Sequence, residues 1–191
     1  MKKQIGSPRF QTMNLRSLQR ATLAGLAFLA LGACSSPEQE LERYQENERQ
    51  VNEHLVTFDD LDFNVFTNQH WDQLHHSHAQ DVIVHWPDGH QTRGIDVHIE
   101  DLKAMFVYAP DTRIQVHPIK FGDGEWTSVV GTMEGTFTQP MPMPDGTSIA
   151  PTGKPFKLEM STVGRWKDGV MAEEFLFWDN QTFMKQIGLA Q

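Results

Sequence analysis

The carboxylate best placed by its sequence surroundings to do chemistry is Asp179. It ends a predicted strand, 170–179, in which alternate residues share one face with it: Met171, Glu173, Phe175 and Phe177. A carboxylate among aromatic side chains is desolvated, which raises its pKa and suits it to remove a proton from carbon. Asp179 also directly precedes the helical segment NQTFMKQIG, where it would cap the helix N-terminus. Both roles fit the sequence, and one does not exclude the other.

Histidines form the second group of residues with chemical potential. His85 and His90 flank the turn sequence Trp-Pro-Asp-Gly, and a histidine beside a pocket can orient or polarise a substrate oxygen. The alternative for His85 is a half-buried side chain held by hydrogen bonds. The motif HHSH places His75 and His78 one helical step apart, as two metal ligands can be. No cysteine or acidic cluster stands at a matching spacing, so we expect no metal site and no cofactor.

Composition limits the class of protein. The 191 residues are 39% hydrophobic and 21% charged, which is typical of one globular domain. The formal net charge is −9, opposite in sign to that of proteins that bind a nucleic-acid backbone. We therefore expect no nucleic-acid partner.

The first 33 residues have the layout of a secretory signal. Five basic residues and no acidic one precede or flank an uncharged apolar run that extends from Ala21 to Ala33. The run ends in LGAC, which resembles the lipobox of bacterial lipoproteins, where the cysteine is lipidated and becomes the new N-terminus. Cys34 is the only cysteine, and a buried core thiol is the alternative. The resemblance implies a lipid anchor at Cys34 and, from Ser35, the periplasmic side of the outer membrane. A start at Met13 would give a more typical signal than one at Met1.

The mature sequence predicts a tether followed by one domain. Residues 34–54 are mostly Glu, Gln, Arg and Asn, which indicates a polar helical tether, and the domain comprises 55–191. Apolar residues at helical steps predict helices from Leu55 to a break at Asn68, then around Trp71, Leu74 and Ala79, and then over 95–106.

Strand patterns dominate the rest of the chain. The segment DVIVHW reads as a first strand, and longer strands are predicted over 112–121, 125–138, 155–166 and 170–179. The pair Asp168-Gly169 is a hairpin signal. Residues 139–154 contain three prolines and predict a long loop, which is either a plain connector or a lid over a cavity. Helices followed by an antiparallel meander indicate an α+β fold with helices on one face of a curved sheet.

Three separated segments resemble the SnoaL-like polyketide cyclases and their ester cyclase relatives, which belong to the nuclear transport factor two-like superfamily. They are HWPDGHQTRG with the helix after it, EEFLFWD near the C-terminus, and the short helix ending in QIG. The resemblance implies a cone in which helices close one side of a strongly curved antiparallel sheet around an apolar pocket. It also implies that Asp179 is the general base, that His85 faces the pocket, and that substrate is bound by the following side chains: His90, Trp86, Phe106, Glu173, Phe175, Phe177 and Phe183.

The expected function is proton transfer of the cyclase or isomerase type, without a cofactor, on a small apolar carbonyl compound. The alternative is a lipid-anchored binding protein that holds an apolar ligand in the cone, because one fold hosts both classes. Export argues against a literal polyketide substrate, since such compounds are usually made in the cytoplasm. Sheets of this type often pair through their outer face, so a homodimer is a further expectation.

Overall fold

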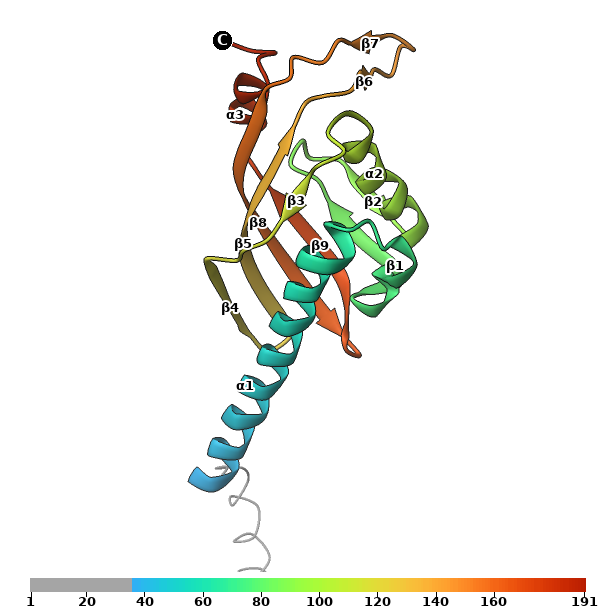
Figure 1. The fold of residues 1–191 in the computed structure, drawn as a ribbon. Coiled ribbons are helices and arrows are strands. Elements are labelled where there is room, and N and C mark those ends of the chain that lie inside the picture. The colour runs from blue at the N-terminus through green and yellow to red at the C-terminus, as the bar shows by residue number, and fades with distance from the viewer. Residues whose placement is uncertain (1–35) are drawn as a thin grey trace, which may run out of the picture. The chain divides into compact units, whose positions relative to one another are not determined.

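A computed structural model describes residues 36–191 (Figure 1). The predicted signal segment and Cys34 lie outside the described residues. Residues Leu41–Gln191 form one compact unit, and the fold set out below is that of this unit together with residues 36–40 at the start of the first helix. None of the helices in the described part is long and apolar enough to cross a membrane.

The first helix, α1, spans Pro37–Asp60, and its sequence stabilises it locally. Ser36 and Gln39 form a capping box, in which each side chain bonds the backbone N–H of the other residue at 3.0 and 3.2 Å. Farther along, Arg49 pairs with Glu46 and Glu53 at 2.6 and 2.5 Å. These exposed pairs account for the polar composition of the segment.

The boundary predicted between tether and domain needs correction. Val51 and Leu55 are both buried, and the Asn47 side chain bonds the Asp123 carboxylate and the Gly124 backbone N–H at 2.9 and 2.7 Å. The second half of the predicted tether therefore packs on the domain. Sequence reasoning missed this because Leu41, Tyr44 and Val51 are the only large apolar residues of the segment, too few to mark a buried helix face.

Two short helices follow α1. Residues Leu61–Phe66 form a π-helix, η1, and Trp71–His76 form a 3-10 helix, η2. Ala79, predicted on a helix, instead lies in strand β1, His78–His85. The third predicted helix is confirmed as α2, Ile95–Tyr108.

The sheet carries most of the remaining chain. Its strands, besides β1, are β2 Gln91–Arg93, β3 Arg113–Ile114, β4 Ile119–Asp123, β5 Trp126–Thr136, β8 Pro155–Lys167 and β9 Val170–Phe177. They are ordered β2-β1-β9-β8-β5-β3, with β4 also paired to β5, and only β1 and β9 run parallel. The predicted strand 112–121 is divided between β3 and β4. The chain ends with helix α3, Asn180–Gln186.

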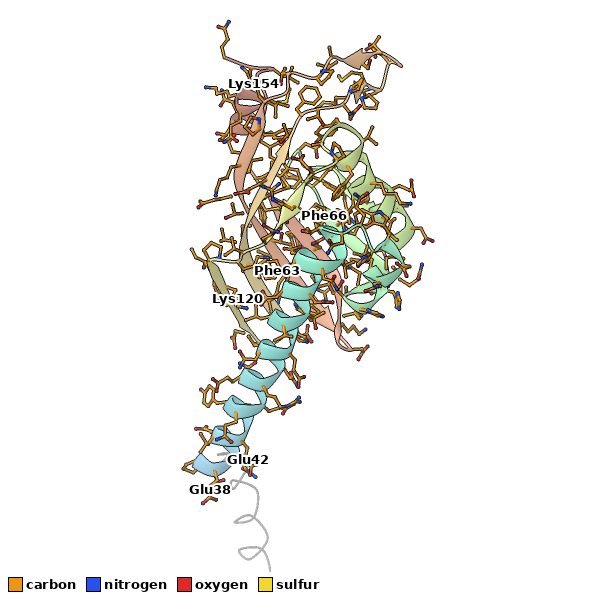
Figure 2. The ribbon with its side chains drawn as sticks, viewed as in Figure 1. Glu38, Glu42, Phe63, Phe66, Lys120 and Lys154 are labelled. Carbon is orange, nitrogen blue, oxygen red and sulfur yellow. The ribbon has the colours of Figure 1, made fainter. Side chains whose placement is uncertain are left out.

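The core lies between the helices and the inner face of the sheet (Figure 1). The predicted alternation is confirmed in β5 and β8, where Val129, Met133, Phe156, Leu158 and Met160 are all buried. Figure 2 shows Phe63 and Phe66 where η1 meets the sheet, whereas the charged side chains of α1 project outward. The fold is thus the predicted α+β arrangement, with helices closing one side of a curved, mainly antiparallel sheet.

A β-bulge in β9 decides which side chains face the core. Met171 pairs with Trp166 and Glu173 pairs with Arg165, so Ala172 is the extra residue between them. A bulge reverses the alternation of inward-facing and outward-facing side chains in the residues that follow it. Glu174, Leu176 and Trp178 therefore point inward, contrary to the prediction that Glu173, Phe175 and Phe177 do so.

The turns follow the sequence signals. Asp168 and Gly169 both have positive φ values, 52° and 84°, and they join β8 to β9 in a tight hairpin as predicted. The long segment 139–154 contains a short hairpin whose two strands have two residues each, β6 Met141–Pro142 and β7 Ser148–Ile149. None of the cavity-lining residues described below comes from this segment, which fits a connector better than a lid.

Candidate functional site

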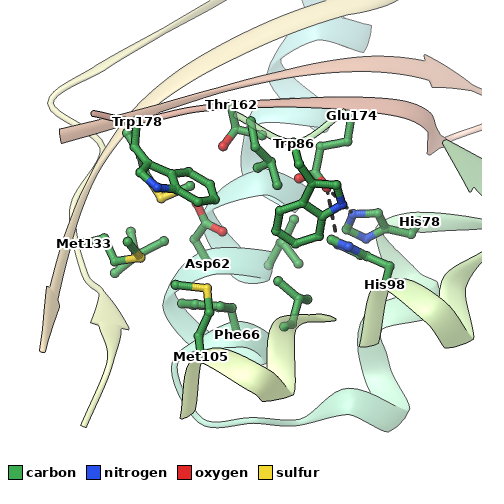
Figure 3. Close-up of a pocket in the computed structure, with 15 residues that line it drawn as sticks. Asp62, Phe66, His78, Trp86, His98, Met105, Met133, Thr162, Glu174 and Trp178 are labelled. Atoms are coloured by element: carbon green, nitrogen blue, oxygen red, sulfur yellow. Dashed lines mark ion pairs between the residues drawn. The ribbon is translucent and has the colours of Figure 1, made fainter. Parts of the chain in front are cut away.

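The inner face of the sheet and the helices enclose a small cavity (Figure 3). Its volume is about 40 Å³, and apolar side chains from η1, α2 and strands β5, β8 and β9 form most of its wall. A site of this size has room for a few water molecules. The polar residues in the wall are few: Asp62, His78, His98, Thr162 and Glu174.

Three residues form the mouth of the cavity, because they alone among its lining side chains are partly exposed: Trp86, Met105 and Trp178. The two indole rings meet edge to face at 6.3 Å. Both indole N–H groups are hydrogen-bonded: Trp86 Nε1 donates to Thr92 Oγ1 at 3.0 Å, and Trp178 Nε1 donates to Asn180 Oδ1 at 2.7 Å. The flexible thioether of Met105 is the part of the mouth best able to adapt to a ligand.

Asp62 brings a carboxylate into the cavity from the π-helix η1. Helix segments of this kind are often found at functional sites. Its Oδ2 accepts a hydrogen bond from His117 Nε2 at 2.7 Å. Burial raises the pKa of Asp62, and the hydrogen bond and charge of His117 only partly offset this effect. Asp62 is therefore a buried carboxylate with increased affinity for a proton, facing an apolar space.

His117 links Asp62 to the surface. Its Nδ1 donates to Asp59 Oδ1 at 2.8 Å, while Asp59 also pairs with Lys120. Both ring nitrogens thus face carboxylates, which favours the protonated ring. Burial by itself lowers the pKa of His117, but the hydrogen bonds and charges of Asp62 and Asp59 outweigh it, so the pKa is raised. The chain of contacts provides a route for a proton between the cavity and the exterior.

A second polar group lies on another wall of the cavity and consists of His78, His98 and Glu174 (Figure 3). Glu174 Oε2 is 3.3 Å from His98 Nε2 and 3.7 Å from His78 Nε2. Burial raises the pKa of Glu174, but the two histidines outweigh it and the pKa is lowered. Burial lowers the pKa of His98 to about 4. Near neutral pH the cluster therefore contains an ionised carboxylate and a neutral His98.

Asp179 does not lie in the cavity, so the predicted position among aromatic walls is wrong. It is exposed, because the bulge at Ala172 turns this end of the strand over. The alternative of helix capping is confirmed: the carboxylate accepts the backbone N–H groups of Gln181 and Thr182 at 2.9 and 3.1 Å. Hydrogen bonds from the Thr182 side chain and backbone lower the pKa of Asp179.

Capping leads to a prediction for Asp179. Asp179→Asn keeps the accepting oxygen and should change the melting temperature by less than about 1 °C, whereas Asp179→Ala should lower it by about 2–4 °C. Neither variant should slow catalysis, because the side chain is outside the cavity. Thermal unfolding of both variants checks the first expectation, and the proton-exchange assay described below checks the second. A large loss of exchange in Asp179→Asn would restore this residue as a base.

His85, Glu173 and Phe175 are brought together, but on the outer face of the sheet. His85 Nε2 lies 2.9 Å from Glu173 Oε1, and the His85 ring stacks on Phe175 at 4.1 Å. Arg165 Nε also donates to Glu173, at 3.0 Å. The prediction that these residues face the pocket is wrong: the bulge in β9 turns Glu173 and Phe175 outward, and His85 of β1 pairs with Phe175 and shares its face. Of the two interpretations of His85, the half-buried, hydrogen-bonded one is confirmed.

The other residues predicted to bind substrate lie in separate parts of the structure. Trp86 lines the cavity as predicted. His90 is exposed and stacks on Trp86 at 5.6 Å, and Phe106 is buried against Phe66 at 5.2 Å, behind the cavity wall. Phe177 is exposed on the outer face, whereas Phe183 packs on Phe156 at 5.1 Å, away from the lining residues.

Among the polar residues of the cavity, the sequence analysis considered only His78, as part of the HHSH motif, although two others left a signal. Asp62 lies four residues after Phe58, and His98 three after Ile95, so each interrupts an apolar helix face. Glu174 left none, because the bulge that turns it inward cannot be read from alternation. His117 lies between strands and owes its role to its neighbours.

The comparison with protein-family models identifies the relatives of this architecture. The model of the SnoaL-like polyketide cyclases matches residues 61–187, which is more than half of the chain. The chain belongs to the SnoaL-like polyketide cyclase family. The matched range begins at η1 and includes every polar residue of the cavity. Among curated proteins, none matches the chain.

Solved structures agree with the family fold. IdmH from Streptomyces antibioticus, proposed to be a polyketide cyclase, is 20% identical with a TM-score of 0.60, over 71% of this chain and 98% of that one. A protein from Jannaschia sp. CCS1, proposed to be a SnoaL-like cyclase, is 17% identical with a TM-score of 0.63, over 73% and 94%. One from Xanthomonas campestris is 16% identical with a TM-score of 0.60, over 74% and 99%. At these identities the likeness shows the fold, which is the nuclear transport factor two-like cone.

Proposed function

We propose that this SnoaL-like protein is a proton-transfer enzyme of the cyclase or isomerase type that acts on a small, largely apolar carbonyl compound. The observation that carries the proposal is Asp62, a buried carboxylate of raised pKa in the wall of an apolar cavity, backed by a histidine. Family membership supports the reaction class. The base is Asp62 in place of Asp179, because Asp62 lines the cavity and Asp179 does not.

The proposed step uses side chains already in place. Asp62 takes a proton from the carbon next to the carbonyl group, and the electron pair of the broken C–H bond moves to the carbonyl oxygen to form an enolate. His117, hydrogen-bonded to Asp62, stabilises the carboxylate before the step and exchanges the proton with the exterior afterwards. The enolate carbon then takes up a proton in an isomerisation, or attacks a second carbonyl carbon in a ring closure. In the ring closure the resulting alkoxide receives the proton.

The dimensions of the cavity limit the substrate. At about 40 Å³ it has room for only a few water molecules, so entry of even a small ketone requires the mouth residues to move. Apolar side chains in the walls select a substrate with few polar groups. A compact carbonyl compound therefore fits the site better than an extended polyketide.

Deuterium uptake tests the reaction class without knowledge of the natural substrate. Small β-dicarbonyl compounds are incubated with the protein in heavy water, and exchange at the acidic carbon is followed by NMR. We expect saturable exchange well above the buffer rate for at least one compound. Saturable binding without exchange would favour the alternative, a binding protein that holds an apolar ligand.

We also propose export and lipidation at Cys34, a proposal that rests on the sequence alone. Cys34→Ser should release the protein from membranes and leave the N-terminal segment uncleaved, because both steps need the cysteine sulfur. Membrane fractionation and the intact mass of the chain measure these effects. Unchanged fractionation together with an unchanged mass would exclude a lipoprotein.

Apolar side chains on the outer face of the sheet support a homodimer as a further proposal. Phe121, Trp126 and Phe177 are exposed by 61%, 43% and 53%, and their strands pair in a register that places them on that face. Exposed apolar surface of this kind often marks an interface. Light scattering of the unlipidated Cys34→Ser chain should give twice the monomer mass, and a monomer at high concentration would refute the dimer.

A further inference from the structure

Three buried side chains with metal-binding atoms meet in the wall of the cavity. His78 is the first residue of β1, His98 lies in α2 and Glu174 lies in β9. Their side chains are only 1%, 2% and 5% exposed, and one ligand atom from each lies within 4.8 Å of the others. Figure 3 shows both imidazoles directed at the Glu174 carboxylate.

Hydrogen bonding fixes which nitrogen of His78 is available. The Ser77 hydroxyl donates to the Leu74 carbonyl at 3.1 Å, so its oxygen is left to accept from His78 Nδ1, 2.9 Å away. When Nδ1 donates to this oxygen, a neutral His78 has its lone pair on Nε2. Metal-binding histidines are commonly oriented by such a hydrogen bond from the other ring nitrogen.

The atoms that face one another in this cluster lack a partner. His78 Nε2 and Glu174 Oε2 are buried, make no hydrogen bond among the described residues, and lie 3.7 Å apart. In that tautomer two lone pairs face each other, which is costly unless a proton, a water molecule or a cation lies between them. The nearby Asp62 adds to the negative charge that Glu174 contributes to this part of the cavity.

The spacing of the atoms is near that of ligands around one cation. Metal–ligand bonds of 2.0–2.2 Å in a tetrahedron place ligand atoms about 3.3 Å apart. Glu174 Oε2 lies 3.3 and 3.7 Å from the two histidine Nε2 atoms, and the three ligand atoms lie within 4.8 Å of one another, so the side chains must close in on a bound ion.

We propose that His78, His98 and Glu174 bind one divalent transition-metal ion of the zinc class, with an open coordination position toward the cavity. Two imidazoles and one carboxylate are a common donor set for such ions, and an open position is typical of sites that meet a substrate. This inference rests on the proposed function and adds to it: a bound ion would polarise the carbonyl oxygen while Asp62 takes the proton. It replaces the expectation, drawn from the HHSH motif, that the chain has no metal site.

The first experiment uses the whole chain purified without a histidine tag. After treatment with a chelator, Zn²⁺ and Co²⁺ are titrated separately. We expect about one ion per chain, a visible absorption band from bound Co²⁺ that Zn²⁺ abolishes, and a higher melting temperature with either ion. No binding at millimolar Zn²⁺ would overturn the proposal and leave a shared proton as the partner of Glu174.

Variants of the cluster residues show where the ion binds. Glu174→Gln and His98→Gln should each weaken Co²⁺ binding by at least about 100-fold, and Ser77→Ala, which removes the hydrogen bond that orients His78, by about 10–100-fold. The matched control is the double variant His75→Gln/His76→Gln, since these two histidines are exposed and outside the cluster. It should bind like the wild type. Loss of binding in this control, with retention in Glu174→Gln, would place the ion on the surface and refute the cluster.

The metal proposal and the proposed function can fail separately. Asp62→Asn should keep the Co²⁺ band and lose proton exchange, because Asp62 is not among the ligands. Exchange by wild type that contains no metal and binds none would refute only the metal site. If Glu174→Gln does not fold, the Co²⁺ titration of the wild type and of the surface control still decides the question.

Discussion

Replacing Asp62 by asparagine should lower the rate of deuterium exchange at an acidic carbon by about 100-fold or more, because the amide cannot take up a proton. The variant should fold, since its side-chain oxygen can still accept the hydrogen bond from His117. The matched control is Asp60→Asn, two residues away, whose exposed side chain lies outside the cavity. Equal loss of exchange in both variants would point to damage to the helix in place of loss of the base.

The pH dependence of the deuterium-exchange rate shows whether the pKa of Asp62 is raised or lowered. Exchange needs the carboxylate, so the rate should fall as the pH drops through a pKa that lies above the ordinary value of about 3.9. A group whose pKa is higher in the folded than in the unfolded state stabilises the fold at a pH below its unfolded-state pKa. This contribution is lost as the pH rises through the folded-state pKa. Asp62→Asn should therefore be relatively more stable than wild type near pH 7 than near pH 3. A rate independent of pH across this range would contradict the assignment.

Truncating Trp166 should cause the largest loss of stability. The indole is 1% exposed, donates to Thr127 Oγ1 at 2.7 Å, stacks on His54 at 4.4 Å and meets Phe58 edge to face at 6.0 Å. It thereby joins α1 to the sheet. Trp166→Ala should destabilise the fold by about 3–5 kcal/mol, because it leaves a cavity and an unpartnered hydroxyl.

Chemical denaturation of Trp166→Ala measures this cost, and Trp126→Ala is the matched control. Trp126 is 43% exposed on the outer face of the sheet, so its removal should cost less than about 1 kcal/mol. Similar losses in the two variants would show that α1 is not held by Trp166.

Local signals in the sequence were sufficient for the fold class. Alternation placed Val129, Met133 and Leu158 inside, and Asp168-Gly169 marked the last hairpin, because strands and tight turns depend on neighbouring residues. The extent of α1 was missed, since its buried side chains are sparse and their partners lie far along the chain.

The candidate site could not be predicted in the same way. One extra residue, Ala172, reverses the faces of β9 and moves the inward carboxylate from Glu173 to Glu174. The cluster around Glu174 joins residues from β1, α2 and β9, and only the tertiary fold brings them together. Asp62 and His98 could have been suspected as polar interruptions of apolar helix faces, but their partners could not have been named.

The most direct test of the account is a crystal structure with a small cyclic 1,3-diketone bound. The acidic carbon of the ligand should contact the Asp62 carboxylate, and one oxygen should face the cluster of His78, His98 and Glu174, with Trp86, Met105 and Trp178 moved to admit the ring. A diketone bound instead beside Asp179 or on the outer face of the sheet, with the cavity unchanged, would contradict the assignment of the cavity as the active site.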